Sequence, residues 1–221
     1  MKRLVKLLLV VIVLAEGSYA QNVNWRSLRE DQSNLVQLAV GYDFGAVAGL
    51  GYSRSFTLIT PMMAGVEYSF PMGDDLTDDF KVRIGGQIEA MRIGGFSASA
   101  KISSIFRRYQ TELVSIVSFG ADLGVLAGYY DPAWYAAGEF GFDKAITSHL
   151  KHSEVMKAEF PGIRDGWYVP TGGHYYFGVQ GGKTIGESFE LSLRLGATKA
   201  QFNDENAVIP WYLQLGFAVK I

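Results

Sequence analysis

The sequence has no cysteine and only 6 prolines among its 221 residues. The absence of cysteine excludes a disulfide scaffold, a cysteine-ligated metal site and cysteine catalysis. Charge is also scarce: 19% of the residues are charged and the net charge is −2, which leaves no basic footprint for nucleic acid. Hydrophobic residues nevertheless make up 48% of the chain and aromatic residues 14%, which excludes a disordered protein. The length fits one domain of roughly 200 residues.

Long hydrophobic runs are missing after Ala20, so the sequence predicts no membrane-spanning helix there. Residues 1–20 start with basic side chains, continue with a short apolar core at 7–15 and end with Ser18 and Ala20, the small residues of a cleavage site. The alternative is an uncleaved anchor, but the apolar core is shorter than the roughly 20 residues that span a bilayer. We interpret 1–20 as a secretory signal peptide.

The rest of the chain alternates apolar with small or polar residues, which is the period of a β-strand. The final segment shows this best, with apolar Trp211, Leu213, Leu215, Phe217, Val219 and Ile221 at every second position. The pattern predicts about ten strands, with eight or twelve as alternatives. They lie near 35–44, 46–56, 60–70, 80–92, 95–107, 111–130, 134–144, 174–183, 187–199 and 208–221. Residues 21–34 precede them as a polar arm expected on the periplasmic side, and 35–221 form the barrel.

The two faces of these strands can be assigned in two ways. In a soluble barrel the apolar face would point inward, whereas in a membrane barrel it faces lipid. Most predicted strands match the roughly 9–11 residues with which a tilted strand crosses a bilayer. The polar face is rich in Gly, Ser, Ala and Gln, as a crowded lumen would be. Aromatic residues near strand ends suit two interfacial girdles: Phe44, Phe56, Phe70, Phe80, Phe96, Phe106, Trp134, Phe189 and Trp211.

The lengths of the connections provide a further test. The long connections Pro71–Asp79, Ala145–Gly173 and Ala200–Ala207 follow the third, seventh and ninth strands and therefore lie at one end. The tight connections at Gly94 and Asp131–Ala133 lie at the other end, as in outer-membrane barrels. The sequence thus predicts an all-β fold, a transmembrane antiparallel up-and-down β-barrel with a short helix in the long loop 145–173.

With this architecture and its alternating last strand, the chain resembles the small bacterial outer-membrane β-barrel proteins. In that family the last strand, which usually ends in an aromatic residue, is recognised by the barrel-assembly machinery; here the last residue is Ile221. The resemblance implies the outer membrane of a Gram-negative cell, with membrane lipid, lipopolysaccharide and the assembly machinery as partners. It does not fix an activity, because the family includes adhesins, narrow pores, scaffolds and a few lipid-modifying enzymes.

The loop 145–173 contains or adjoins all three histidines. Its first half, 145–160, is expected to be helical, which would place His149 and His152 on one face together with Met156. His149, His152 and His174 are therefore candidate ligands for zinc or copper. The alternative is a loop helix that packs its mixed face over the barrel mouth.

Two further features of the loops have a functional and a structural reading. Ser148 and Ser153 adjoin histidines, as a hydrolase nucleophile would, but no nucleophile-elbow pattern is present. Carboxylates in the loop 71–79 are candidates for weak calcium binding or for a solvated loop, namely Asp74, Asp75, Asp78 and Asp79.

The predicted lumen contains many charged residues, namely Arg54, Glu67, Arg83, Glu89, Lys101, Glu112, Asp122, Glu139, Asp143, Glu190, Arg194 and Lys220. They would form either a selectivity lining or a plug of paired charges, and narrow barrels favour the plug. We expect a non-enzymatic structural or interaction protein that presents extracellular loops and binds no cofactor. The alternatives are a narrow channel or ligand-binding barrel and, third, a lipid-modifying hydrolase. A protein partner is expected on the extracellular or the periplasmic side.

Overall fold

The computed structural model describes residues 23–29, 31–42, 45–72, 78–202 and 206–221. The predicted signal peptide, Phe44, Asp74 and Asp75 lie outside the described residues. Eleven strands and one helix follow in order: β1 (Asn34–Tyr42), β2 (Ala46–Thr57), β3 (Pro61–Pro71), β4 (Phe80–Ile93), β5 (Phe96–Gln110), β6 (Val114–Tyr130), β7 (Trp134–His152), α2 (Glu154–Glu159), β8 (Gly166–Tyr168), β9 (His174–Ile185), β10 (Phe189–Ala200) and β11 (Asn206–Lys220).

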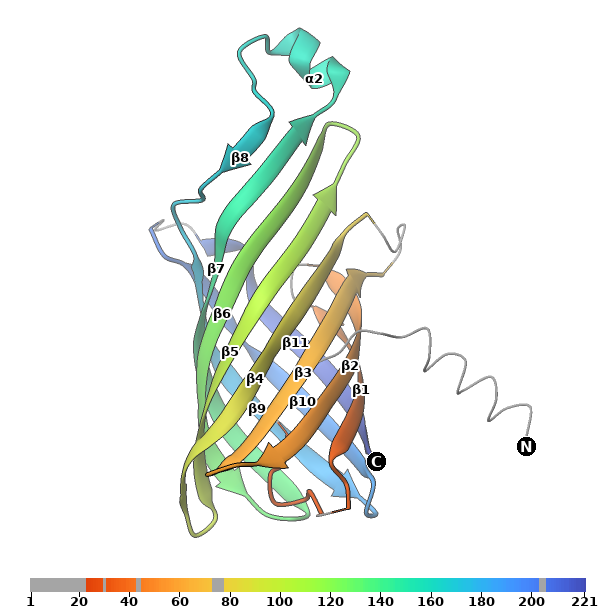
Figure 1. The fold of residues 1–221 in the computed structure, drawn as a ribbon, viewed down its shortest axis with the longest axis vertical. Coiled ribbons are helices and arrows are strands. Elements are labelled where there is room, and N and C mark those ends of the chain that lie inside the picture. The colour runs from red at the N-terminus through yellow and green to blue at the C-terminus, as the bar shows by residue number, and fades with distance from the viewer. Residues whose placement is uncertain (1–22, 30, 43–44, 73–77, 203–205) are drawn as a thin grey trace, which may run out of the picture.

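Ten of the strands form a closed antiparallel barrel (Figure 1). Consecutive strands pair as hairpins, β1 pairs with β11, and β7 pairs with both β6 and β9. The three-residue strand β8 is attached only to the upper part of β7. The predicted barrel of about ten strands is confirmed.

The polarity of the wall is that of a membrane barrel, with apolar side chains outside and polar side chains inside. On β11, for example, Leu213, Leu215 and Phe217 are exposed, whereas Gln214 is buried in the lumen. The same holds on β7, where Phe140 is exposed and Glu139 is buried. Among the described residues, no helix is long and apolar enough to cross a membrane.

Aromatic side chains form rings of contacts on the outer face at both ends of the wall. Near the upper end, rings contact one another in series across neighbouring strands: Tyr68–Phe80, Phe80–Phe106 and Phe106–Phe119. Near the lower end, Tyr129 contacts both Phe96 and Trp134. Phe96 and Phe106 lie ten residues apart on β5. At about 3.4 Å per residue and a tilt of about 40°, they are separated by about 26 Å across the membrane, close to the usual apolar band of about 25 Å.

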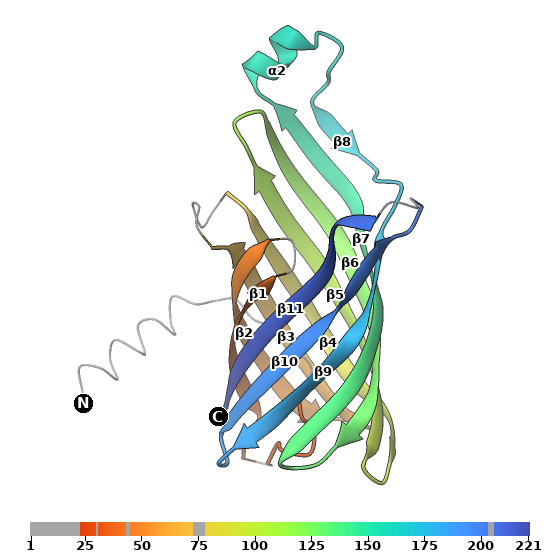
Figure 2. The same cartoon turned by 180° about the vertical axis from the view of Figure 1, so that it is seen from behind.

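The ends of the barrel differ as the connection lengths predict. Four turns at the lower end are tight, and two of them rely on glycines with positive φ, Gly94 at +59° and Gly186 at +64°. The long connections after β3, β7 and β10 lie at the upper end, and the C-terminus lies at the lower end (Figures 1 and 2). In an outer membrane the lower end would face the periplasm.

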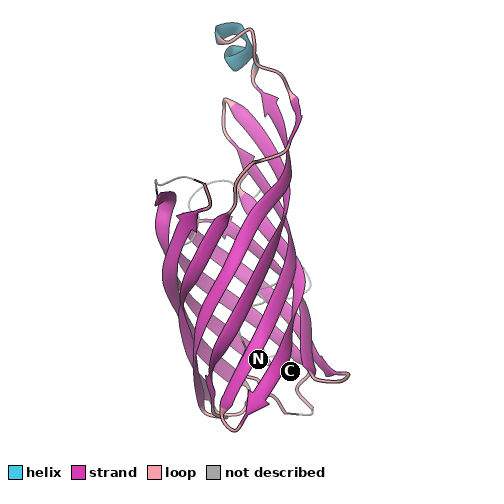
Figure 3. Ribbon diagram, turned by 90° about the vertical axis from the view of Figure 1, so that its left-hand side faces the viewer, coloured by secondary structure: helices cyan, strands magenta, loops and turns pink. Residues whose placement is uncertain are grey.

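The prediction of a helix over 145–160 is wrong for its first half. β7 continues to His152, and only Glu154–Glu159 is helical, capped by Ser153, whose hydroxyl accepts a hydrogen bond from the Met156 amide. The short helix expected in the loop is therefore present, but it begins later (Figure 3). The reason is the partner strand: β6 pairs with β7 up to Val114–His152, across a bulge at Ile146, and these backbone bonds outweigh the local helical pattern.

Candidate functional site

The centre of the lumen contains a buried network of side chains from three strands. Arg194 on β10 bonds through Nε to Glu139 Oε1 on β7 at 2.6 Å, and its Nη1 donates to Gln214 Oε1 on β11 at 3.1 Å. The Tyr212 hydroxyl donates to the same Glu139 oxygen at 2.6 Å, and the Arg194 guanidinium lies 4.4 Å from the centre of the Tyr212 ring. Each of these four side chains is hydrogen-bonded to at least one other member of the cluster.

A second cluster adjoins the first in the lumen. Asp122 on β6 accepts a hydrogen bond from the Tyr176 hydroxyl at 2.7 Å and lies 3.7 Å from the Lys101 ammonium. Arg83 bonds to Glu67 and lies 3.8 Å from Asp122. The Lys101 ammonium is 4.9 Å from the centre of the Tyr176 ring, and the Arg194 guanidinium is 5.5 Å from it, which joins the two clusters.

Together the clusters contain three cations and three carboxylates, so their formal charges cancel. Six of the charged residues predicted for the lumen lie here: Glu67, Arg83, Lys101, Asp122, Glu139 and Arg194. The network places paired charges in the lumen, and within it neither sign is in excess to select ions. Sequence reasoning missed Tyr176 and Tyr212, although both occupy inward positions of alternating strands.

Two residues predicted for the lumen lie elsewhere. Arg54 is exposed on the outer face of β2, at the lower end between Tyr52 and Phe56. Glu112 is exposed in the turn between β5 and β6. The prediction failed at Arg54 because β2 reads Tyr-Ser-Arg-Ser-Phe, in which the small serines face inward and arginine shares the aromatic face.

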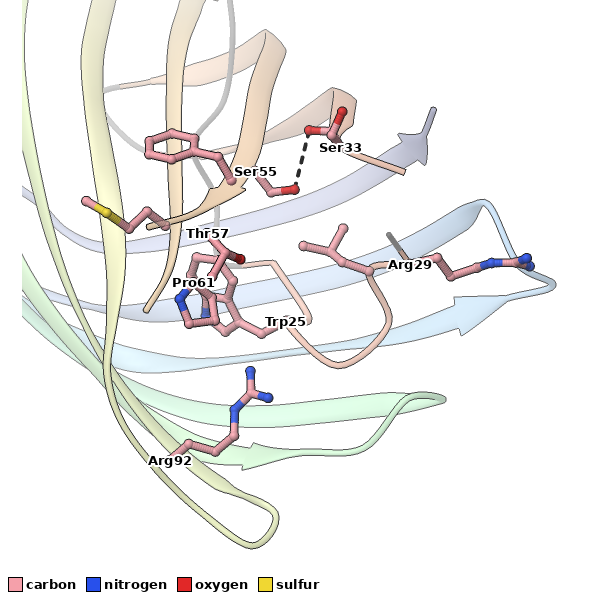
Figure 4. Close-up of a pocket in the computed structure, with 10 residues that line it drawn as sticks. Trp25, Arg29, Ser33, Ser55, Thr57, Pro61 and Arg92 are labelled. Atoms are coloured by element: carbon pink, nitrogen blue, oxygen red, sulfur yellow. Dashed lines mark hydrogen bonds between the residues drawn. The ribbon is translucent and has the colours of Figure 1, made fainter. Parts of the chain in front are cut away.

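Residues 23–29 and 31–33, the described part of the arm before β1, contact strands and turns at the lower mouth of the barrel (Figure 4). Trp25 is buried, and its indole N–H donates to Ser99 Oγ on β5 at 3.2 Å. Asn24 donates to the carbonyl of Asp131 in the β6–β7 turn at 2.7 Å. Ser27 contacts both Glu190 and Lys220, which themselves form an ion pair at 3.3 Å. The described part of the predicted polar arm thus packs inside the mouth.

A pocket of about 400 Å³ lies beside the arm at this mouth. Trp25, Leu28 and Arg29 of the arm form one side, and the β2–β3 strand ends and Arg92 form the other (Figure 4). Arg92 is already held by two hydrogen bonds to Glu89, at 2.6 and 2.9 Å. The pocket is therefore a gap beside the arm. The Arg92 guanidinium at the end of β4 is already bound to Glu89 of the same strand.

The upper ends of β5, β6 and β7 project beyond the rest of the wall and bear α2 and β8 (Figure 1). We call residues 107–118 and 144–173 the extension. The register gives its outer face: Arg108, Val117, His149 and Trp167 are partners in one row across four strands. The His149 ring contacts the Trp167 ring at 5.0 Å between centres.

The three candidate metal ligands do not come together. His149 faces Trp167, whereas His152 contacts Asp165. His174 pairs with Asp143, six residues below His149 on β7 and so about 20 Å away along the strand. In the described part of the chain, no group of three or more His, Cys, Asp or Glu residues is placed to hold a metal ion.

Asp165 connects the segment before β8 with the end of β7 and with α2. One of its oxygens accepts the His152 amide at 2.8 Å and lies 3.0 Å from His152 Nδ1, and the other lies 2.9 Å from the Lys157 ammonium. The His152 amide and the Lys157 ammonium hold the pKa of the Asp165 carboxyl well below its usual range. Hydrogen bonds to Asp165 and Glu154 raise the pKa of Lys157.

The two serines beside the histidines have structural partners. The Ser148 hydroxyl bonds to Ser118 across the β6–β7 pair at 2.8 Å, and Ser153 caps α2. The hydrolase reading required a base beside one of these hydroxyls. The Ser148 hydroxyl instead contacts Ser118, and the Ser153 hydroxyl accepts from the Met156 amide.

No protein-family model matches the sequence, and no curated protein matches it either. Among solved structures, a KdgM porin is similar over 85% of this chain and 99% of its own, with 8% identity and a TM-score of 0.42. A second structure, the KdgM porin in complex with disordered oligogalacturonate, gives 9% identity and a TM-score of 0.43 over the same shares. The β domain of the Bordetella autotransporter BrkA gives 12% identity and a TM-score of 0.40 over 87% of this chain and 100% of its own. At these values the comparisons assign neither a family nor an activity.

Proposed function

We propose that this protein is a non-enzymatic barrel of the bacterial outer membrane whose lumen is occluded and which acts as an interaction protein through its extension. The observation that carries this proposal is the contrast between the lumen, which contains the charge network and the buried arm, and α2, which has no buried residue. We infer that the central network and the arm both obstruct the path through the barrel. The surface left for function is therefore at the upper end.

The outer-membrane location is supported by the outward apolar wall, its two aromatic rings and the short lower turns. These features together are those of bacterial outer-membrane barrels. The predicted signal peptide agrees with export from the cytoplasm. On this placement the extension projects outside the cell.

Apolar side chains at the tip of the extension support an interaction role. Val155 and Phe160, on α2 and just after it, are exposed, and so is Leu113 in the adjacent β5–β6 turn. Single exposed apolar residues are common on soluble surfaces. Here they lie on and beside a short helix that contributes no residue to a core. A protein partner that covers this tip would bury them.

Heat-modifiability on gels and conductance in planar bilayers test the barrel and its occlusion. We expect the refolded chain to shift on heating and to show no stable open steps. Stable open steps from the intact chain would contradict the occluded lumen.

Capture of a surface partner tests the interaction role. Val155→Ser combined with Phe160→Ser should abolish capture, because it removes the apolar tip. The matched control, Glu154→Ser with Glu159→Ser, changes two polar residues of the same helix and should retain the partner. Equal capture by both pairs would contradict the tip as the contact surface.

A narrow channel is the second candidate, and one observation favours it. Gln37 Oε1, Ser53 Oγ and Gln180 Nε2 are buried in the lumen without a hydrogen-bond partner among the described residues. Buried polar atoms of this kind are usually satisfied by water. A continuous file of such waters would give small open steps that grow when the arm is deleted.

A further inference from the structure

We infer that the lower part of the extension is a lipid-binding face, on which Trp167, Arg108 and Lys151 contact the headgroups of the outer leaflet, while α2 stands clear of the membrane. This inference rests on the proposed membrane location. It divides the extension into a part that binds lipid and a part that remains free for a partner.

The first observation is that the upper aromatic ring continues onto β8. Phe106 contacts Phe119 on β6, and Phe119 in turn contacts Trp167 at 6.2 Å between ring centres. Trp167 therefore shares the outer face with side chains that meet lipid. It is nevertheless 61% exposed, so the protein itself covers only part of its ring. Tryptophan is enriched where a membrane meets water because its ring is apolar and its N–H is polar.

The second observation is the level of Trp167 relative to the ring. Its row crosses β6 at Val117, two residues above Phe119. At about 3.4 Å per residue and a tilt of about 40°, this is about 5 Å above the edge of the hydrocarbon. The headgroup layer on each side of a bilayer is about 5–7 Å thick. Because the centre of the Trp167 ring is 6.2 Å from that of Phe119, Trp167 lies at the boundary between the hydrocarbon and that layer.

The third observation is the charge on the same face. Arg108 is in the row of Trp167, and Lys151 is one outward position higher on β7 and exposed. Long basic side chains above an aromatic ring reach the phosphates of the headgroups. Residue 152, by contrast, pairs with Val114, five residues above Phe119 and thus about 13 Å higher, beyond the headgroups. The helix α2 starts after that point.

The position of Trp167 can be measured by fluorescence quenching in refolded single-tryptophan variants. In each variant phenylalanine replaces all tryptophans but one. The first variant retains Trp167, the second retains Trp211 on the outer face of β11, and the third retains Trp25 in the lower mouth. Each is refolded into phosphatidylcholine vesicles brominated either near the ester end or near the methyl end of the chains. Heat-modifiability verifies that each variant forms the barrel.

We expect Trp167 and Trp211 to be quenched, and Trp167 to respond mainly to bromine near the ester end. Trp25 should respond least, because its ring packs inside the mouth. Quenching of Trp211 without quenching of Trp167 would overturn the lipid-binding face and leave the membrane barrel intact. Failure of quenching at both Trp211 and Trp167 would overturn the membrane location, and with it the inference.

The basic side chains are tested in the variant that retains only Trp167, in vesicles that contain phosphatidylglycerol. Arg108→Gln with Lys151→Gln should weaken quenching of Trp167, because the headgroups lose two cationic partners. The matched control is Arg164→Gln, which removes a charge from the free part of the loop, leaves the Asp165 cluster intact and should leave quenching unchanged. An equal effect of the control would contradict the assignment of Arg108 and Lys151 to the headgroups.

Discussion

The lumen and the extension each contain a cluster of charges with similar bond lengths but very different surroundings. In the lumen, Arg194 and Glu139 lie 2.6 Å apart with their side chains 15% and 1% exposed. In the extension, Lys157 and Asp165 lie 2.9 Å apart and are 35% and 32% exposed. Water screens the second pair and not the first, so the same geometry has a large energetic consequence only in the barrel.

The difference also concerns what each cluster holds together. The lumen network connects strands that are distant in the sequence and fills the space between them. The Asp165 cluster connects two segments of one loop, the segment before β8 and the segment from the end of β7 through α2. Loss of the first should therefore affect the whole barrel, and loss of the second only the shape of the loop.

The largest effect is expected for Glu139→Ala. The change leaves the Arg194 guanidinium buried without its carboxylate and removes the acceptor of the Tyr212 hydroxyl. Breaking a buried pair in this way typically costs about 3–5 kcal/mol. Urea unfolding of the barrel in vesicles measures the loss. An unchanged midpoint would mean that water replaces Glu139 in the lumen, and would weaken the case for occlusion.

The next largest effect is expected for Trp25→Ala in the lower mouth. Trp25 packs in a buried cluster with Leu35, Met63 and Tyr130, and truncation of a buried tryptophan costs about 3–5 kcal/mol. Because Trp25 lies in an arm outside the sheet, we expect a value near the lower limit. The measurement is the same urea titration, with Arg29→Ala on the exposed side of the arm as the control. A similar loss in both variants would contradict the packing argument.

A much smaller effect is expected when the tip is removed. Replacing residues 153–165 by a short glycine-serine linker should change the unfolding free energy of the barrel by less than about 0.5 kcal/mol, as for surface changes. The reason is that α2 buries no side chain. Heat-modifiability and the urea midpoint report the result. A loss comparable to that of Glu139→Ala would show that the tip supports the barrel after all.

The smallest effect is a local dependence on pH. Because the pKa of Asp165 is lowered on folding, its contribution is complete above its unfolded pKa of about 3.9 and is lost as the pH falls through the folded pKa. The raised pKa of Lys157 has the opposite sign, so its contribution is lost only above about pH 10.

Hydrogen exchange measures this dependence at about pH 7 and about pH 3, with rates corrected for intrinsic exchange. The His152 amide should lose protection at the lower pH, and the barrel amides should not. Asp165→Asn should remove the difference. A pH dependence that persists in this variant would assign it to another group.

The barrel could be predicted closely from the sequence. The length of β7 in the extension could have been predicted as well. A strand at 111–130 followed by a tight turn at 131–133 requires a partner strand of similar length, which extends β7 toward residue 152. The helical spacing of His149 and His152 concealed this requirement. The end of the helix, by contrast, was marked correctly by Pro161 and Gly162.

The sequence by itself determined the strands, the polarity of their two faces and the end of the barrel at which the long loops lie. These follow from a period of two and from the lengths of connections, which are local properties of the chain. Only the tertiary structure decided that Glu139 pairs with Arg194 and that Trp25 bonds to Ser99. It also decided that Trp167 contacts Phe119 of the upper aromatic ring. These contacts connect residues 48 to 74 positions apart, and the closure and register of the sheet select them from many that the same pattern allows.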